Sequence, residues 1–364
     1  MRFIDEYRDE ERAAEVVREI TRATRGRWAL MEVCGGQTHA ILRFGLDRML
    51  PDGIELLHGP GCPVCVTPAE AVDQAVEIAL MTDAVLLSFG DMLRVPGNEM
   101  DLLSARARGA DVRTVYSPLD AFKLAVELPH RQVVFFAVGF ETTAPAVASA
   151  VYSAANARLM NFSVLSAHFL VPPALYAIME SVDCRVQAFL APGHVCSVTG
   201  YRDYESFSAQ WKLPVVVTGF EPLDILQGIM MAVKMLEEGR WGVENHYRRA
   251  VQRDGNLAAL ARMFDVFEVC DAVWRGIGVI PRSGLCIRQR YAQYDARARF
   301  GLKERLPAQG SACISGDILR GIKKPEQCPE FGVHCTPDRP LGAPMVSSEG
   351  ACAAYYRYRR DASN

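Results

Sequence analysis

Short apolar runs rich in β-branched residues alternate with helix-like segments through most of the chain. The apolar runs are WALMEV, IELLHG, AVLLSFG, VRTVYSP, QVVFFAVGF, FSVLSAH, VQAFLAPGH and PVVVTGF. Helix-like segments such as THAILRFGLDRML and AEAVDQAVEIAL lie between them. Continuous apolar strands separated by helices are typical of parallel sheets that are covered on both faces. The pattern therefore predicts an α/β protein.

The chain also carries a faint internal repeat. TVYSPLDAFKLAVEL at 114–128 resembles VVTGFEPLDILQGIMMAV at 216–233, because in both a strand runs into Pro-Leu-Asp and then an apolar helix. Proline and aspartate are common at helix starts. The alternative to a true internal repeat is therefore a chance match of two helix-start signals. A chain of 364 residues usually forms more than one domain. We expect an N-terminal helix over 1–25, two related α/β lobes over 26–125 and 126–240, and a C-terminal region over 241–364 with few regular elements.

Charge and hydropathy narrow the class of partner. The chain has 40 basic and 43 acidic residues, a net charge of -3 and no block of one sign, which argues against nucleic acid or a membrane surface. Its first 25 residues are too charged for a signal peptide, and no apolar run reaches the ~18 residues of a membrane span. We therefore expect a cytoplasmic location.

In a reducing cytosol, clustered cysteines are more often metal ligands or redox thiols than disulfide pairs. Four of the eleven lie in the Gly- and Pro-rich last sixth of the chain, separated by 14, 6 and 16 residues: Cys313, Cys328, Cys335 and Cys352. Four thiolates on irregular backbone are a ligand set for a [4Fe–4S] cluster or for zinc, and the wide spacing favours the cluster. We expect the four scattered thiols to be buried small side chains: Cys184, Cys196, Cys270 and Cys286.

The stretch MEVCGGQTHA places Cys34 at the end of a predicted strand, with two glycines after it and a helix that begins near Thr38. The carboxyl end of a parallel strand is where open α/β sheets bind their ligands. We expect the helix N-terminus to lower the thiol pKa and favour thiolate. Gly35 and Gly36 would let a bound group approach the backbone. His39 would add a base or a ligand one turn away, and a structural histidine is the alternative.

The stretch HGPGCPVCVTP follows the next predicted strand, so Cys62 and Cys65 should open onto the same sheet edge as Cys34. A C-x-x-C pair with Pro63 inside it suits a redox dithiol, and half of a metal site is the alternative. Polar residues also follow other predicted strands and suggest a lined cleft between the lobes: Asp91, Arg94, Glu141, Thr142, Thr143, His168, His194 and Glu221.

Taken together, several long motifs resemble the HypD family, a maturation factor of [NiFe] hydrogenases. The resemblance covers nearly the whole chain and rests on MEVCGGQTHAI, HGPGCPVCVTP, FGDMLRVPG, GFETTAP, APGHV, GFEPLDILQG, WRGIG and MVSSEGACAAYY. It implies two Rossmann-like parallel-sheet lobes with a C-terminal iron–sulfur region. The implied role is an assembly scaffold with redox activity, rather than a turnover enzyme, on which the hydrogenase iron receives cyanide and carbon monoxide.

The resemblance also implies roles for single residues. Cys34 would bind the iron together with a cysteine of a HypC-type small chaperone, and a HypE-type protein would donate the cyanide that HypF helps to make. Cys62 and Cys65 would be the redox thiol pair, and the four tail cysteines the [4Fe–4S] ligands. This chain departs from the family pattern at Ser315 and Pro344, where accessory thiols are expected, which puts a thiol relay through those positions in doubt.

Two other functions fit parts of the sequence. A free-standing iron–sulfur thiol–disulfide oxidoreductase would use the C-x-x-C pair and the cluster but leaves Cys34 without a role. A structural zinc protein acting as a binding platform would use the tail cysteines alone.

Overall fold

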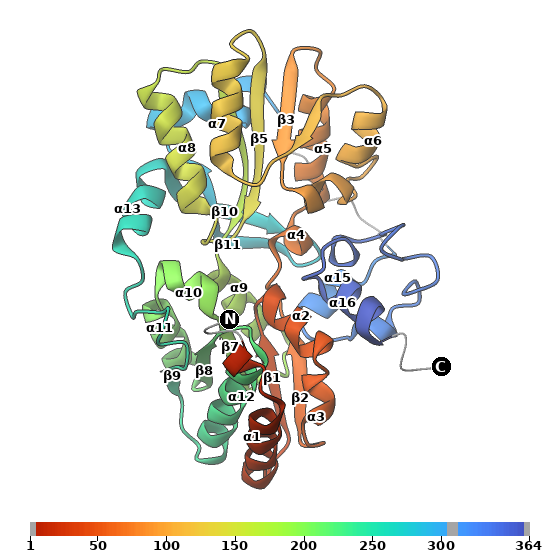
Figure 1. The fold of residues 1–364 in the computed structure, drawn as a ribbon, viewed down its shortest axis with the longest axis vertical. Coiled ribbons are helices and arrows are strands. Elements are labelled where there is room, and N and C mark those ends of the chain that lie inside the picture. Colours follow the sequence, from red (N-terminus) through yellow and green to blue (C-terminus); the bar gives the residue numbers. More distant parts are fainter. Residues whose placement is uncertain (1–4, 304–311, 360–364) are drawn as a thin grey trace.

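The computed structural model describes residues 5–303 and 312–359 and places the strands in two sheets, one above the other in Figure 1. The lower sheet has the order β2-β1-β7-β8-β9, and all of its strands are parallel. These strands are β1 (Trp28–Glu32), β2 (Ile54–His58), β7 (Ala188–Pro192), β8 (Pro214–Thr218) and β9 (Gly242–Asn245). Its helices are α1 (Glu10–Ala23), α2 (Gly35–Arg43), α3 (Leu46–Met49), α4 (Pro63–Val66), α9 (Val171–Met179), α10 (Gly193–Thr199), α11 (Arg202–Trp211) and α12 (Pro222–Glu237), preceded by the short turn η1 (Asp5–Tyr7).

The upper sheet has the order β10-β11-β6-β5-β3-β4. Four of its strands are parallel, and a hairpin of two antiparallel strands completes one edge. The strands are β3 (Ala84–Ser88), β4 (Val112–Thr114), β5 (Gln132–Gly139), β6 (Phe162–Phe169), β10 (Phe267–Trp274) and β11 (Gly278–Ile287). The helices are α5 (Ala69–Ala79), α6 (Leu102–Ala107), α7 (Pro118–Glu127), α8 (Ala144–Asn156), α13 (Leu257–Val266) and α14 (Ala296–Phe300), with the 3-10 turns η2 (Gly90–Arg94) and η3 (Gln289–Tyr294).

The predicted α/β class is confirmed, and each of the eight predicted strands is present. The central strands β3, β7 and β8 are buried at every position, because helices cover both faces of each sheet. The N-terminal segment forms the amphipathic helix α1, which packs against α12. None of the helices in the described part of the chain is long and apolar enough to cross a membrane.

Sheet membership differs from the expected ranges 26–125 and 126–240. The chain begins in the lower sheet with β1 and β2, builds β3 to β6 in the upper sheet, returns for β7 to β9, and crosses again through α13 to β10 and β11. The expected C-terminal range 241–364 therefore contains a lower-sheet strand and two upper-sheet strands. Apolar strands of both sheets look alike in sequence, so their order along the chain does not reveal their partners.

Both sheets nevertheless share one topology. Numbered by their own chain order, the parallel strands run 2-1-3-4-5 in the lower sheet and 2-1-3-4 in the upper sheet, the doubly wound arrangement of flavodoxin-like folds. The two Pro-Leu-Asp segments do start helices, α7 and α12. They follow the second strand of the upper sheet and the fourth strand of the lower one, so their likeness reflects helix-start chemistry at non-equivalent places.

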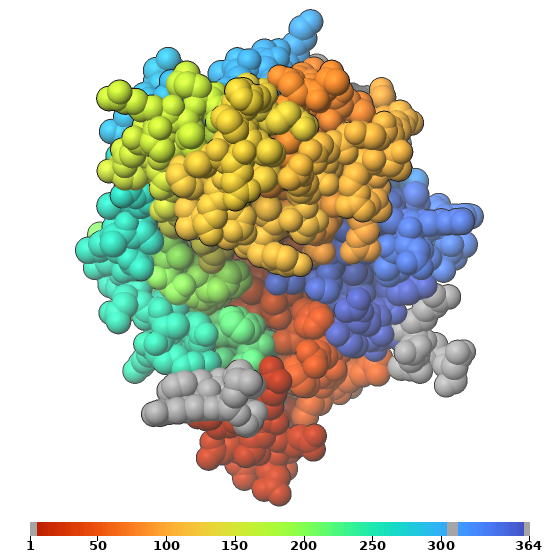
Figure 2. Space-filling view, turned by 45° about the horizontal axis from the view of Figure 1, so that its top comes forward, coloured from red at the N-terminus to blue at the C-terminus, as the bar shows by residue number. Residues whose placement is uncertain are grey.

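The C-terminal segment lies against the junction of the two lobes (Figures 1 and 2). From residue 312 onward it has few regular elements, as expected: α15 (Ser315–Leu319), η4 (Pro325–Gln327), η5 (Ala343–Met345) and α16 (Ala351–Arg359). Helix α16 packs on α2, and η5 packs on α4. The tail is thereby fixed to the two segments that carry the N-terminal cysteines.

Candidate functional site

Cys34 lies where the strand order of the lower sheet reverses. It follows β1 and is the N-cap residue of α2, while β7 on the other side of the reversal leads into α10 and His194. Such a reversal opens a crevice at the carboxyl ends of the strands. The Sγ of Cys34 lies 3.3 Å from Nδ1 of His194. The predicted position of Cys34 at a strand end and helix start is confirmed, and its nearest histidine is His194 rather than His39.

The electrostatics of Cys34 differ from the expectation. The side chain is only 1% exposed. Burial raises the pKa of the Cys34 thiol, although the backbone N–H groups of Gln37 and Gly36 act in the opposite direction. The helix N-terminus is present as predicted, but desolvation outweighs it. Burial also lowers the pKa of His194, so its imidazole is neutral at pH 7.

A buried polar network that the sequence reasoning missed supports the Cys34 backbone. Glu32 accepts hydrogen bonds from the Cys34 N–H at 3.1 Å and from the Thr38 hydroxyl at 2.5 Å. His58 Nδ1 lies 2.7 Å from the same carboxylate, and His58 Nε2 lies 3.1 Å from the hydroxyl of Tyr355 on α16. Burial raises the pKa of Glu32, and its hydrogen bonds oppose that shift. One sequence signal was available, a glutamate that interrupts the apolar strand WALMEV.

His39 faces the tail instead of Cys34. Its Nδ1 lies 3.0 Å from the Ser348 carbonyl oxygen, and its Nε2 lies 3.4 Å from the Tyr358 hydroxyl. It lines a groove of about 370 Å³ together with Arg8, Gly36, Ala40, Arg43, Phe44, Phe220, Glu221, Ser348 and Glu349. A Cβ on Gly36 would lie 3.6 Å from Cys34 Sγ, so this groove is adjacent to the thiol.

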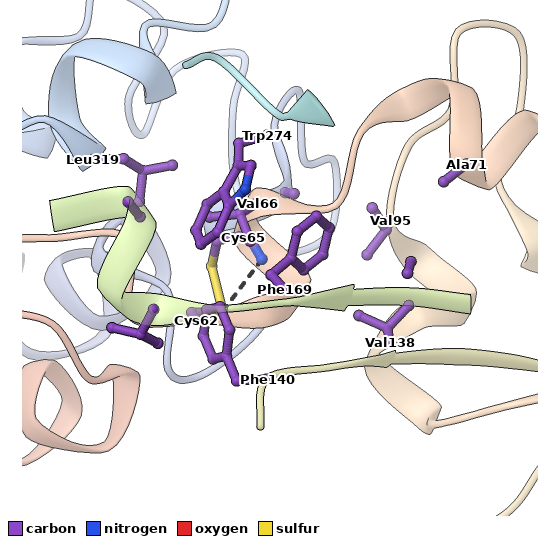
Figure 3. Close-up of a cluster of buried hydrophobic side chains, with 14 of the residues drawn as sticks. Cys62, Cys65, Val66, Ala71, Val95, Val138, Phe140, Phe169, Trp274 and Leu319 are labelled. Carbon is purple, nitrogen blue, oxygen red and sulfur yellow. Dashed lines mark hydrogen bonds between the residues drawn. A yellow bond between two sulfur atoms is a disulfide. The ribbon is translucent and has the colours of Figure 1, made fainter. Parts of the chain in front are cut away.

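Cys62 and Cys65 form a disulfide at the start of α4, with their Cα atoms 5.3 Å apart. The predicted shared edge with Cys34 is confirmed: Gly35 N–H donates to the Gly61 carbonyl at 2.8 Å, and a side chain on Gly61 would collide with the Cys34 backbone nitrogen. Both half-cystines are buried in an apolar cluster that includes Phe140, Phe169 and Trp274 (Figure 3). This disulfide is closed to large molecules.

The four tail cysteines line one pocket, and Ser315 and Pro344 lie in its wall. Burial raises the pKa of Cys352, and the neighbouring thiols of Cys313, Cys335 and Cys328 raise it further. The four sulfurs are therefore close enough to repel one another as thiolates. Within residues 5–303 and 312–359 no three His, Cys, Asp or Glu side chains are arranged to hold a single metal ion.

The donor set and its surroundings fit a [4Fe–4S] cluster. Four thiolates facing one pocket need a positively charged core to offset their repulsion, and iron–sulfur clusters take such ligand sets. Leu341 N–H donates to Cys335 Sγ at 3.4 Å, a hydrogen bond of the kind that tunes cluster cysteines. Gly342 lies so close to Cys313 Sγ that a side chain there would displace the thiol.

The other predicted polar residues do not line one cleft. Glu221 forms an ion pair with Arg8 beside the groove near Cys34. His168 is buried against Ser166, and burial lowers its pKa to about 3. Glu141 lines a separate pocket of about 750 Å³ between α9, α11 and α13. The expectation of one lined cleft is therefore wrong, because these strand ends belong to two sheets and face different segments.

Among the four scattered cysteines, Cys196 is buried as expected. The other three are partly exposed, and burial together with neighbouring Cys286 raises the pKa of Cys270 to about 12. Cys270 and Cys286 sit on the adjoining strands β10 and β11 at the edge of the upper sheet, where burial is incomplete.

Comparison with known proteins agrees with the motifs. The family model described as "HypD: Hydrogenase formation hypA family" matches residues 11–359. The Hydrogenase maturation factor HypD2 of Bradyrhizobium diazoefficiens is 48% identical over 99% of this chain and 97% of the relative. The Hydrogenase maturation factors HypD of Cupriavidus necator and Escherichia coli are each 46% identical; the first match covers 99% of this chain and 98% of the relative, and the second covers both in full. The chain therefore belongs to the HypD family and has a role in hydrogenase maturation.

Proposed function

We propose that the chain is the scaffold on which the Fe(CN)2CO group of [NiFe] hydrogenase is assembled. Cys34 anchors the iron, which is the cargo of the reaction, and a HypC-type small chaperone shares it. A HypE-type protein delivers cyanide. The Cys62–Cys65 pair and a [4Fe–4S] cluster held by Cys313, Cys328, Cys335 and Cys352 supply electrons.

One observation carries this proposal: the three sulfur groups occupy adjoining segments. The loop before the disulfide contacts the Cys34 backbone through the Gly35 N–H bond to the Gly61 carbonyl. On its other side, α4 packs on η5, whose Pro344 and Met345 line the cluster pocket. The disulfide therefore lies between the anchor thiol and the cluster ligands, which is where an electron store serving the anchor would have to be.

The Cys34 site is suited to take up a metal cation and release a proton. Burial keeps the thiol protonated, and a metal ion is the charge that stabilises the thiolate in such a place. The neutral imidazole of His194, 3.3 Å away, can accept that proton on Nδ1 when Nε2 carries the other hydrogen. The proton on Cys34 Sγ thus passes to His194 as the iron–sulfur bond forms.

The network behind the anchor holds it in position. Glu32 fixes the Cys34 N–H and the Thr38 hydroxyl, and His58 connects that carboxylate to Tyr355 on α16.

Reduction of the Cys62–Cys65 disulfide converts one S–S bond to two thiols and takes up two electrons and two protons. A bound [4Fe–4S] cluster would pass these two electrons one at a time, in two successive transfers.

The groove beside Cys34 suits the approach of partner proteins. It is lined by the exposed rings of Phe44 and Phe220, and Arg8, Arg43 and Glu221 surround them. Aromatic side chains with charged neighbours are typical of protein–protein contacts. A partner cysteine entering there would reach the iron from the open side of α2.

A free-standing thiol–disulfide oxidoreductase is a poorer match. Thiol–disulfide exchange needs a thiolate of one protein to attack a sulfur of the other. Here Cys62 is 3% exposed and Cys65 is 0% exposed, and Figure 3 shows the pair between Trp274 and Phe140. The pair is placed to serve an internal site.

Infrared spectroscopy of the anaerobically purified complex with its small partner tests the proposal. Wild type should show cyanide and carbonyl stretching bands, and Cys34→Ala should lose them because the iron has no anchor. Cys196→Ala is a matched control, since that thiol is equally buried but lies outside the site. Bands at full strength in Cys34→Ala would exclude Cys34 as the anchor. Zinc in place of iron and sulfide on elemental analysis would exclude the cluster.

A further inference from the structure

The tip of the β10–β11 hairpin, residues 274–278, lies between the disulfide and the cluster pocket. Trp274 covers the disulfide and lies next to Cys65 in Figure 3. The Arg275 N–H donates to the Val66 carbonyl at the end of α4, at 2.8 Å. On the other side, Gly276 packs so closely on the start of α15 that a Cβ there would lie 2.7 Å from Gly316 N. Helix α15 begins two residues after Cys313.

The side chain of Arg275 is held at this tip by carbonyl oxygens. Its Nε donates to the Thr67 carbonyl at 2.6 Å and its Nη2 to the Pro96 carbonyl at 2.8 Å. No carboxylate of the described residues forms an ion pair with it, although the charges of Glu70 and Asp73 raise the pKa of its guanidinium. Burial lowers the pKa of the guanidinium to about 10, and Cys313 is the strongest opposing influence. Arg275 is therefore charged at neutral pH.

A desolvated guanidinium without a carboxylate partner is unfavourable unless another anion is near. The hairpin tip joins Arg275 to the segment of the cluster ligands: its neighbour Gly276 packs on Gly316, three residues after Cys313, and Cys313 belongs to the set of four that faces the cluster pocket. The Cys313 thiol also raises the pKa of Arg275. Four thiolates around an iron–sulfur core carry a net negative charge, which one-electron reduction increases. A fixed positive charge at the hairpin tip, next to the cluster-ligand segment, would stabilise the reduced form more than the oxidised form, and net charge is one of the factors that set cluster potentials.

We propose that Arg275 sets the reduction potential of the cluster by holding a positive charge between the cluster ligands and the Cys62–Cys65 pair. This inference rests on the cluster of the proposed function. It makes Arg275 a residue that acts through the cluster, and it explains why a charged side chain occupies a hairpin tip that is otherwise packed by Trp274 and glycines.

Redox titration of the reconstituted full-length protein, followed by its visible absorption, tests the role of charge. Arg275→Gln should lower the equilibrium constant for one-electron reduction at least tenfold, which is about 59 mV. Arg275→Lys keeps the charge and should stay closer to wild type than the Gln variant. Arg299→Gln is the matched control, because Arg299 is also partly buried and bonded to carbonyl oxygens but lies in the upper lobe; it should leave the potential unchanged.

The outcomes separate this inference from the proposed function. Iron and sulfide in all four proteins with the same potential in Arg275→Gln as in wild type would refute the role of Arg275 and leave the cluster intact. Loss of the cluster in the Gln variant but not in the Lys variant would support a requirement for charge. Loss in both variants would show that Arg275 is structural and overturn the inference. A wild-type protein without iron and sulfide after reconstitution would refute the cluster itself, and this inference with it.

Discussion

Glu141 should make the stability of the protein fall as the pH rises. Its carboxyl group is 1% exposed; Oε1 accepts a hydrogen bond from the Val171 N–H at 2.9 Å, and Oε2 has no partner among the described residues. Burial raises the pKa of Glu141 from 4.5 to about 7, and Asp203 adds to the shift. The folded state therefore binds more protons than the unfolded state between these two values, so ionisation weakens it.

The size of the effect follows from the two pKa values. The interval from 4.5 to about 7 corresponds to about 3 kcal/mol at about 1.4 kcal/mol per pKa unit. This stabilisation is complete below pH 4.5 and is lost as the pH rises through about 7. The glutamine in Glu141→Gln does not titrate. The free energy of unfolding of this variant, measured relative to wild type, should therefore rise by about 3 kcal/mol as the pH increases from 4.5 to about 7.

Urea denaturation followed by circular dichroism at several pH values measures this difference. Glu205→Gln is an informative control, because Arg253 lowers the pKa of the Glu205 carboxylate. The contribution of Glu205 to stability therefore changes with pH in the opposite direction. The stabilisation by Glu205 is present above its unfolded pKa and is lost as the pH falls. A difference between wild type and Glu141→Gln that does not change with pH would show that Glu141 is hydrated or paired, and the reasoning from burial would be wrong.

Three further predictions concern the sulfur groups. Cys335→Ala should lose iron, sulfide and visible absorption, whereas Ser315→Ala should keep all three, because a neutral hydroxyl is a poor ligand; a changed spectrum in the serine variant would indicate serine ligation. Alkylation of denatured protein should count two more thiols after reduction than after oxidation, a difference that should vanish in Cys65→Ala; thiols released only by a chelator would mark a metal site instead. Gly61→Ala should destabilise the protein by about 2 kcal/mol or more in urea and weaken the infrared bands, since its methyl group would collide with the Cys34 backbone; unchanged stability would mean that this loop moves freely.

The sequence was most informative where local chemistry decides the structure. Apolar runs identify every central strand. A helix after Cys34 was also predicted, although it begins at Gly35 rather than near Thr38. Sheet membership could not be predicted, because strands of both sheets carry the same apolar pattern and only packing selects their neighbours. The contact between Cys34 and His194 depends on β1 pairing with β7, so it was hidden for the same reason.

The raised pKa of Cys34 illustrates a second limit. A helix N-terminus can be predicted from sequence, but the burial that outweighs it is a tertiary property. The network of Glu32, His58 and Tyr355 likewise joins residues from both ends of the chain. By contrast, the four tail cysteines were grouped correctly, since a polar segment without a core of its own offers thiols little other use.

The interleaving of the two sheets has a consequence for biosynthesis. Leu30 of β1 pairs with Ala188 of β7, so β1, the first strand to leave the ribosome, has no inner neighbour until about half of the chain has been made. Meanwhile β3 to β6, an uninterrupted insertion between β2 and β7, can assemble the parallel part of the upper sheet. Closing such a long loop slows folding and leaves an apolar strand edge exposed during translation. A nascent chain released before β7 would therefore contain the four parallel strands of the upper sheet and an aggregation-prone pair of parallel strands, β1 and β2, with Cys34 uncovered at the end of β1.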